Sequence, residues 1–498
     1  MSDVFKPVPK LETGVVGLDQ ITLGGLPQAR TTLVSGTAGT GKTSLALEFL
    51  ARGIQEHDEP GVFITFEERP KDIRRNAASL GLDIPAWEAS GRWVFVDASD
   101  AGPESEDVVG SYDFGGLMAR VGHAVRTIGA KRLSFDSLGA VFSRFADAGM
   151  VRAELKRVAD GLREHQITSV LTAERTDEYG AISRFGIEEF VADSVVLLRN
   201  VLEQERRRRT VEILKLRGSP HRTGEWLFTI DPTQGLVVLP LSVIGPGRPA
   251  SSERVTTGIP ELDTMCGGGF YRDAAAFVSG PTGIGKTLLI THFVVAGVAA
   301  GERCVLFSFE ESREQLLRNA TSWGFDLEAM EATGSLRLVC ESPELASLED
   351  HFLTVKQNVE DFRPTRLGVD NLSALERVAT VRGIRDVVIG LGSFVKNLEV
   401  TTLFTATSGF VGGSSVTEAH LSVLTDTILS LRYAEVAAEM RRSVTVVKMR
   451  GSWHDRAIRE FTIDNHGMHI GEPLRGAGGV VLPTEGLPGS GAASPGAS

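Results

Sequence analysis

The sequence predicts an α/β fold with two tandem domains, each a mainly parallel, twisted sheet covered by helices. One observation is that short, apolar, β-rich runs alternate with helical runs along most of the 498 residues. A second is that motifs of the first half recur in the same order in the second half. A third is the length, which is too great for a single core. We therefore treat the chain as an internal duplication with a first and a second copy.

A glycine-rich motif, G-x-x-x-x-G-K-T, organises each copy. It spans residues 36–43 and again 280–287, each time after a strand-like run and before a helical one. Its glycines let backbone N–H groups close around a phosphate, and the helix N-terminus adds its positive dipole end. Two matches in matched contexts predict that the chain binds nucleoside triphosphate twice. The residues expected to hold it are Gly36, Gly39, Thr40, Gly41, Lys42, Thr43 and Ser44, then Gly280, Gly283, Ile284, Gly285, Lys286, Thr287 and Leu288.

The spacing between matching residues locates one insertion. Matching positions lie 244 and 243 residues apart early in each copy, and 234 and 233 apart later. The first copy is therefore expected to carry a longer loop around residues 98–116. The pairs that define the spacing are Lys42 and Lys286, Glu67 and Glu310, Asp136 and Asp370, and Lys215 and Lys448.

Composition and the positions of proline- and glycine-rich stretches predict the domain boundaries. A first domain is expected over residues 1–240, a Pro/Gly-rich linker over 241–252 and a second domain over 253–475; the tail 476–498, rich in Gly, Ala, Pro and Ser, is expected to be disordered. Apolar spacing predicts a helix over 150–164. Strands are expected at 168–174, 194–199 and 209–216 in the first copy, and at 400–407, 427–432 and 443–449 in the second.

Composition also narrows the class of protein. No apolar run reaches the roughly 20 residues that a membrane span needs, and the N-terminus lacks the order of a signal peptide. Three cysteines without C-x-x-C spacing exclude a disulfide framework and a sequence-evident zinc site. Buried thiols in a cytoplasmic protein are the expectation. A net charge of −12 argues against a protein that binds nucleic acid over its whole surface.

Acidic residues follow two strand-like runs in each copy. Asp136 and Asp370 are expected to coordinate Mg²⁺ together with Thr43 and Thr287, and the alternative is a helix N-cap. The acid pair Glu67 and Glu68, like the matching pair Glu310 and Glu311, is expected to orient the attacking water or hydroxyl. The alternative for these pairs is a solvated acidic turn, and the sequence leaves open which acid of each pair is the base.

Basic residues end one late strand of each copy. Lys215 and Arg217, and likewise Lys448 and Arg450, alternate along the strand and so share one side of it. Such a pair could reach a nucleotide held by a neighbouring subunit as an arginine finger in trans, and the alternative is a basic strand end in water. The run 206–209, four arginines preceded by Glu203 and Glu205, could bind nucleic acid, but a solvated hairpin or a subunit contact is favoured.

These motifs, doubled and in this order, resemble the KaiC family of two-domain ATPases and autokinases in the RecA superfamily. The resemblance covers residues 10–470, and its most specific stretches are 60–68, 200–210, 266–270, 315–323 and 449–455. It implies RecA-like P-loop domains that assemble as a hexamer of two stacked rings, with ATP between subunits. It also implies slow ATP hydrolysis in the first ring, phosphoryl transfer to nearby hydroxyls in the second, and a KaiB-like protein as a candidate partner of the N-terminal ring.

The expected phosphoacceptors lie in the segment 415–426. The resemblance aligns Ser422 with one of two adjacent acceptors and places Val423 where the second, a threonine, would be. Valine keeps the shape of threonine without its hydroxyl, so the second acceptor is lost; Thr417 aligns with a minor one. The tail does not resemble the segment that clock-type members offer to KaiA, so regulation by KaiA is not expected.

The function expected is therefore an ATP- and Mg²⁺-dependent hexameric ATPase that phosphorylates itself on Ser422, as a clock-related or signalling regulator. A DNA-dependent motor of the same superfamily is one alternative, which the acidic balance disfavours. A nucleotide-gated, non-catalytic scaffold is another, which the acids retained in both copies disfavour.

Overall fold

The computed structural model describes residues 8–98, 114–139, 148–183, 191–203, 206–240, 251–408, 425–436 and 439–474. The chain divides into two compact units, Met1–Pro240 and Leu241–Ser498, which correspond to the first and second copies. Most of the linker, the tail, most of the longer loop and the acceptors Ser422 and Thr417 lie outside the described residues. Each copy is described below by itself.

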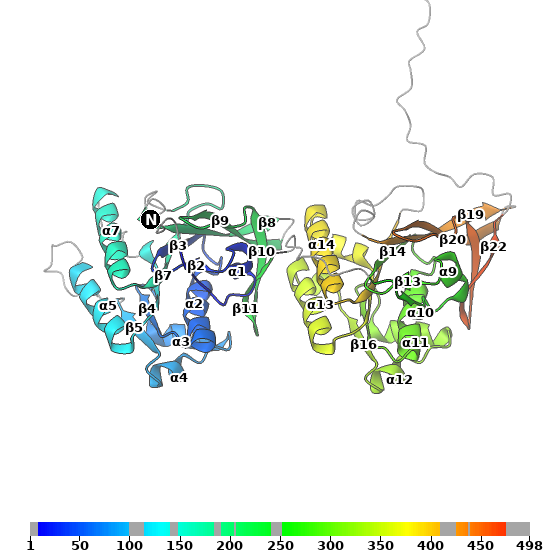
Figure 1. The fold of residues 1–498 in the computed structure, drawn as a ribbon, viewed down its shortest axis with the longest axis horizontal. Coiled ribbons are helices and arrows are strands. Elements are labelled where there is room, and N and C mark those ends of the chain that lie inside the picture. Colours follow the sequence, from blue (N-terminus) through cyan, green and yellow to red (C-terminus); the bar gives the residue numbers. More distant parts are fainter. Residues whose placement is uncertain are drawn as a thin grey trace, which may run out of the picture. The chain divides into compact units, whose positions relative to one another are not determined.

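The first copy is built on a nine-stranded sheet (Figure 1). Its strands are β3 (Thr31–Gly36), β4 (Gly61–Thr65), β5 (Trp93–Asp97), β6 (Arg132–Asp136), β7 (Thr168–Glu174), β8 (Ser194–Glu203), β9 (Arg206–Leu216), β10 (Glu225–Asp231) and β11 (Gly235–Leu239). Their order is β11-β10-β9-β8-β3-β7-β6-β4-β5, and β8 to β5 pair in parallel while β9 to β11 pair antiparallel. The short strands β1 (Lys10–Leu11) and β2 (Leu26–Pro27) form a separate pair.

Helices cover both faces of this sheet because its parallel strands are apolar on both sides. Alternate residues show this: Val34 and Phe63 pack into a core cluster with one set of helices, whereas Leu33 and Ile64 pack into a second cluster with another. The helices are α1 (Leu18–Ile21), α2 (Lys42–His57), α3 (Pro70–Ala78) and α4 (Ile84–Ala89) on the first face, and α5 (Phe114–Ile128) and α7 (Ala148–Glu164) on the second.

The second copy repeats this topology. Its sheet order is β16-β15-β17-β18-β14-β19-β20-β21-β22, with the last three antiparallel. The strands are β14 (Ala275–Gly280), β15 (Cys304–Ser308), β16 (Leu336–Cys340), β17 (Arg366–Asp370), β18 (Thr401–Thr407), β19 (Thr427–Val436), β20 (Glu439–Met449), β21 (Arg459–Asp464) and β22 (Gly467–Pro473), beside the pair β12 (Arg254–Val255) and β13 (Phe270–Tyr271). The helices are α9 (Pro260–Met265), α10 (Lys286–Ala299), α11 (Arg313–Ser322), α12 (Leu327–Ala332), α13 (Leu348–Phe362) and α14 (Val381–Asn397), with 3-10 turns η1 (Pro343–Leu345) and η2 (Leu372–Arg377).

The predicted α/β class is confirmed, and two differences have physical causes. Helices α2 and α10 begin at Lys42 and Lys286, which lie inside the glycine-rich motif. The helical run expected from the sequence begins only after the motif, because the lysine and threonine of the first turn are polar and add no apolar signal. The hairpin β8–β9 extends beyond the predicted strands because Glu203 pairs with Arg206 and Leu202 with Arg207 in the ladder. The residues of these pairs are mostly charged, so the sequence shows no alternation of apolar and polar residues there.

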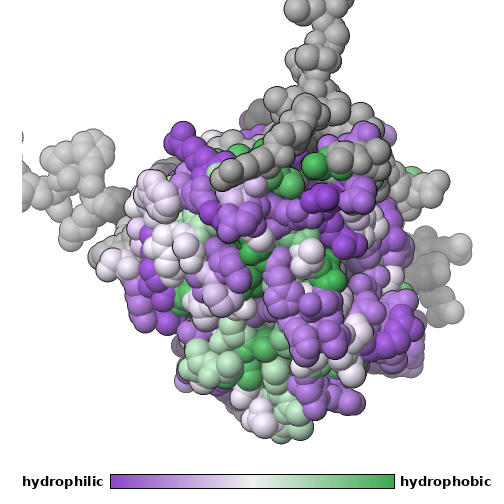
Figure 2. Space-filling view, turned by 90° about the vertical axis from the view of Figure 1, so that its right-hand side faces the viewer, coloured by the Kyte–Doolittle hydropathy of each residue, from purple (hydrophilic) through white to green (hydrophobic). Residues whose placement is uncertain are grey.

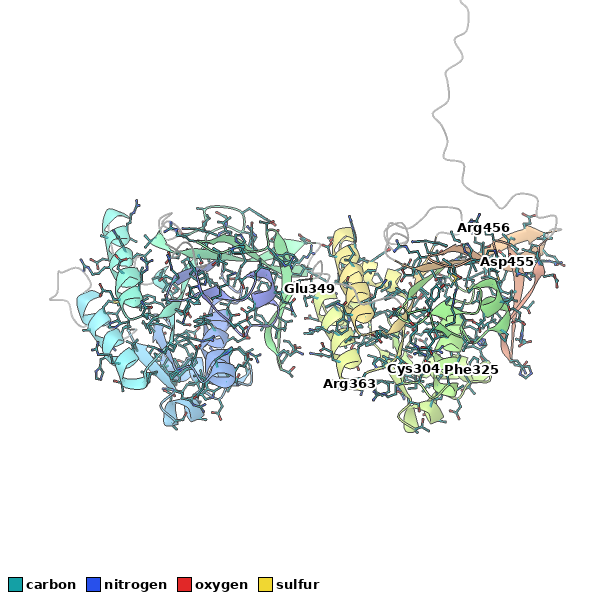
Figure 3. All side chains as sticks on the ribbon, viewed as in Figure 1. Cys304, Phe325, Glu349, Arg363, Asp455 and Arg456 are labelled. Carbon is teal, nitrogen blue, oxygen red and sulfur yellow. The ribbon has the colours of Figure 1, made fainter. Side chains whose placement is uncertain are left out.

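The core of the second copy holds the cysteines. Cys304 and Phe325, labelled in Figure 3, lie in or against the cluster around α10. Cys266 and Cys304 are buried, as predicted, and burial raises the pKa of each thiol to about 12; Cys340 is half-buried. Over the described residues, no cluster of three or more potential metal-ligating side chains occurs, and none of the helices has the length and apolarity to cross a membrane.

Candidate functional site

Each P-loop ends in a glycine that starts the following helix. Gly41 (φ 93°) caps α2 and Gly285 (φ 120°) caps α10, and in neither case does a side chain cap the helix. The left-handed φ requires glycine at both positions. The first N–H groups of each helix are therefore available to an anion such as a phosphate. The geometry of both loops is therefore compatible with the predicted binding of a nucleotide by these residues.

The P-loop lysines fold back onto their own loops. Lys42 Nζ donates to the carbonyls of Gly36 (3.0 Å) and Thr37 (2.8 Å). Lys286 Nζ donates in the same way to Gly280 (2.8 Å) and Pro281 (3.0 Å). Burial lowers the pKa of both lysines, while nearby carboxylates oppose that shift. Each lysine side chain is thus held at the loop that is predicted to bind the phosphates.

A threonine and an aspartate meet beside each P-loop. Thr43 Oγ1 donates to Asp136 Oδ2 at 2.8 Å, and Thr287 Oγ1 donates to Asp370 Oδ2 at 2.7 Å. Hydroxyl and carboxylate oxygens are the ligands that Mg²⁺ prefers, so the donor set fits the predicted metal. The second oxygen of each aspartate accepts a hydrogen bond from a threonine that sequence reasoning missed, Thr172 in the first copy and Thr405 in the second.

The acidic pairs lie at the ends of β4 and β15, and each first acid is held from the neighbouring strand. Glu67 Oε1 accepts a hydrogen bond from Ser137 at 2.7 Å, and Glu310 Oε2 accepts one from Asn371 at 2.9 Å. Ser137 directly follows Asp136, and Asn371 directly follows Asp370. In each copy, the same strand end therefore carries the expected metal ligand and the residue that holds the first acid of the pair.

Each second acid is held by a helix. Glu68 Oε2 accepts a hydrogen bond from Asn76 at 3.2 Å and Glu311 Oε2 accepts one from Asn319 at 3.1 Å. Burial raises the pKa of Glu311. The asparagines lie 243 residues apart, which is the early spacing of the duplication, so that spacing was the signal that could have found them.

A pocket of about 400 Å³ brings these parts together in the second copy. It is lined by the P-loop, by Glu310 and Glu311, and by the helix α11. Sequence reasoning had not assigned six of its lining residues, which are Thr282, Gln315, Arg318, Asn319, Trp323 and Ile463. At the early spacing, Leu80 stands in the first copy where Trp323 stands in the second, so the two sites are not identical.

The basic strand ends lie away from the P-loop of their own copy. In the register of the first sheet, Gly36 pairs with Leu198, whereas Leu216 pairs with Ser194 at the other end of β8. Four residues of strand separate the two levels by roughly 13 Å. Lys215 donates to the carbonyl of Ala192 at 2.8 Å and Arg217 lies 3.9 Å from Asp193.

The second copy repeats this arrangement. Lys448 donates to the carbonyl of Thr425 at 2.9 Å, and Arg450 lies 3.7 Å from Asp426. Neither basic pair meets the phosphate loop of its own copy.

The first P-loop has a further neighbour that the sequence did not reveal. Thr37 Oγ1 donates to Glu178 Oε1 at 2.5 Å, and the other oxygen of Glu178 accepts the N–H of Asn200 at 3.2 Å. The arginine run lies beyond this point: Arg207 donates to the carbonyl of Asn200 at 2.8 Å and Arg208 pairs with Glu203 at 3.4 Å. These contacts are those of a hairpin, the favoured alternative.

Comparison with known proteins agrees with this geometry. The family model of the KaiC ATPase matches residues 11–243 and 255–475. The chain is 54% identical to the circadian clock protein KaiC3 of Synechocystis sp. over 96% of this chain and 94% of that protein. It is 49% identical to the circadian clock oscillator protein KaiC of Parathermosynechococcus lividus, over 95% and 87%. The doubled P-loop sheet and these matches over nearly the full length show that the chain belongs to the KaiC family of ATPases.

Proposed function

We propose that this ATPase transfers the γ-phosphoryl group of ATP to its own Ser422 in the second copy, and hydrolyses ATP in both copies. The observation that carries the proposal is the pocket of the second copy, where the P-loop, Thr287 and the acids Glu310 and Glu311 meet. A phosphoryl transfer enzyme needs a phosphate cradle, a metal ligand set and a carboxylate for the nucleophile. All three are present on neighbouring strand ends.

The proposed roles follow from the geometry of each site. Lys42 and Lys286 bind the phosphates through Nζ, and Thr43 with Asp136, like Thr287 with Asp370, holds Mg²⁺. Bound there, Mg²⁺ would neutralise charge that develops on the phosphate oxygens. The acid pairs orient the nucleophile, which is water in the first copy and the Ser422 hydroxyl in the second. Val423 leaves Ser422 without an adjacent second acceptor.

The proposed assembly is a cytoplasmic homohexamer of two stacked rings. Exposed apolar residues at matching positions support self-association: Leu214 on β9 is 43% exposed and Val447 on β20 is 56% exposed. Both stand beside the basic strand ends, which cannot reach a nucleotide in cis. The face of the second copy that carries β22 mixes polar residues with apolar areas (Figure 2). The relatives are named as clock proteins, so a KaiB-like protein is the proposed partner of the first ring, and KaiA is not.

The direct test is to incubate the purified chain with γ-labelled ATP and Mg²⁺ and to map the label by mass spectrometry. We expect label on Ser422 that is lost in Ser422→Ala. In Thr417→Ala, most of the label should remain. Glu310→Gln with Glu311→Gln should lower labelling by roughly a hundredfold or more, because the hydroxyl loses its base. Phosphate release without label on Ser422 would contradict the autokinase and leave an ATPase.

A further inference from the structure

The second copy carries a buried histidine–carboxylate pair where the first copy is apolar. His351 on α13 is 2% exposed, and its Nδ1 lies 2.9 Å from Glu341 Oε2 at the end of β16. By the spacings of the duplication, Leu117 and Ala98 stand at these two positions in the first copy, and both are buried in its core. Both members of the bonded pair therefore stand where the first copy has an apolar residue.

The contacts of the ring define its protonation. Nε2 of His351 lies 3.0 Å from the carbonyl oxygen of Pro343, which can only accept, so Nε2 carries a proton. Nδ1 faces a carboxylate, which favours a proton there as well. Burial alone would lower the pKa of His351, but the hydrogen bonds that the ring donates to Glu341 and Pro343, together with the negative charge of Glu341, outweigh it and raise the pKa. The two acceptors that face the ring therefore favour the doubly protonated imidazolium, and the pKa of His351 is shifted upward.

Other charged groups near the ring act in the same direction or are paired. Asp350, the preceding residue on α13, also raises the pKa of His351. On the packed turn η1, Glu344 pairs with Arg377 of η2 at 3.3 Å. After β15, Glu310 directly follows Phe309, the residue whose ring contacts His351.

The pair is connected to the acidic turn by two routes. The backbone N–H of Glu341 donates to the carbonyl of Ser308 at 2.9 Å, at the end of β15. The imidazole ring of His351 packs edge-on against Phe309, with centroids 5.3 Å apart and planes at 75°. Phe309 donates its N–H to the carbonyl of Asp370 at 2.6 Å. A change in the pair therefore reaches both residues that precede Glu310.

We propose that His351 and Glu341 are positioning residues of the second site: together they fix the turn that carries Glu310, and they do so only while the imidazole is protonated. This inference rests on the role of Glu310 in the proposed function. Because the first copy builds the same turn against Leu117 and Ala98, its own turnover should be independent of any such titration. The two rings would then respond differently to pH.

The experiment uses the full chain with Glu67→Gln and Glu68→Gln, so that phosphate release reports the second copy alone. The main variant is H351L/E341A, which restores the apolar pair of the first copy and is therefore expected to fold. Glu341→Gln keeps a hydrogen bond but removes the charge. Glu344→Ala, a carboxylate on the adjacent turn, is the matched control.

We expect H351L/E341A to lower kcat roughly ten- to a hundredfold with KM for ATP unchanged, because the base is misplaced while the P-loop is intact. In the parent chain, kcat should fall as pH rises above the ordinary histidine range. Glu341→Gln should move that fall to lower pH, and H351L/E341A should abolish it. Glu344→Ala should match the parent. Hydrogen exchange of the peptide over residues 305–311 should be faster in H351L/E341A only.

The inference is overturned if H351L/E341A and Glu341→Gln keep the parent kcat, pH profile and exchange rate. If only the proposed autokinase activity is absent, the outcome is distinguishable. Ser422 then stays unlabelled, while phosphate release and hydrogen exchange in the second copy still change in H351L/E341A.

Discussion

One position of the P-loop helix carries a buried titratable side chain in both copies. Glu48 and His292 lie 244 residues apart, and each accepts a backbone N–H from the last hairpin of its sheet: Glu48 from Leu236 at 2.6 Å and His292 from Met468 at 3.0 Å. Burial raises the pKa of Glu48 to about 7 and lowers the pKa of His292 to about 4. Both side chains are acceptors that tie the helix to the sheet edge, and near neutral pH burial favours the uncharged form of each.

This arrangement predicts how the stability of the first copy depends on pH. Because the folded pKa of Glu48 lies above the value of 4.5 expected in the unfolded chain, folding takes up a proton between pH 4.5 and about 7. The stabilisation is complete below pH 4.5 and is lost as pH rises through about 7. Relative to Glu48→Gln, which stays neutral, the parent should lose about 3 kcal/mol of unfolding free energy over this window.

The measurement is urea unfolding of the full chain at several pH values, followed by tryptophan fluorescence. Replacing Trp323 and Trp453 by Phe leaves Trp87, Trp93 and Trp226, all in the first copy, as reporters. A constant difference between parent and Glu48→Gln from pH 4.5 to 8 would refute the assignment. The matched substitution His292→Gln should leave the first-copy transition unchanged.

At the scale of elements, a buried arginine clamps each P-loop helix to the sheet. Arg366 at the start of β17 bonds Glu302 and the carbonyls of Thr256 and Phe293 at 2.7 and 3.0 Å. The clamp requires Gly297 on α10, because a Cβ there would lie 2.6 Å from Arg366 Cδ. The first copy repeats it, with a Cβ on Gly53 2.4 Å from Arg132 Cδ.

Two glycine substitutions in one copy should therefore change stability in opposite directions. Gly297→Ala should destabilise the second copy by about 1–3 kcal/mol, because the added carbon overpacks the clamp. Gly392→Ala on α14 meets no atom within 4 Å and should stabilise it by up to about 1 kcal/mol through helix propensity. Hydrogen exchange of the α10 and α14 peptides in increasing urea measures both. A stabilising Gly297→Ala would mean that the clamp yields without strain.

The elements also show what sequence can and cannot supply. The P-loops, the strand ends and the acids were predictable because each is a local pattern repeated at a fixed spacing. Thr172 and Trp323 were not, because they reach the site only through sheet order and helix packing. The charged rungs of β8 and β9 had no apolar signal at all.

At the scale of the whole molecule, the position of the basic strand ends bears on the proposed assembly. Lys215 and Arg217 lie at the opposite end of the strands from the first P-loop, which favours the predicted role in trans over one in cis. A ring of head-to-tail subunits would bring this end against the P-loop of the next subunit. The proposed hexamer therefore predicts that a nucleotide site takes its loop from one subunit and its finger from another.

Mixed assemblies test this arrangement in a background of Glu310→Gln and Glu311→Gln, which silences the second copy. Subunits with Lys42→Ala lack the loop function, and subunits with Arg217→Ala lack the finger; each alone should release phosphate at roughly a hundredth of the parent rate or less. When the two are coexpressed in equal amounts, the intact loop of an Arg217→Ala subunit meets the intact finger of a Lys42→Ala subunit at about a quarter of the interfaces. Activity should then recover to about a quarter of the parent. Coexpression of Lys42→Ala with Thr43→Ala should recover nothing, since both defects lie in the loop. If the finger acted within its own subunit, the first mixture would be as inactive as the second.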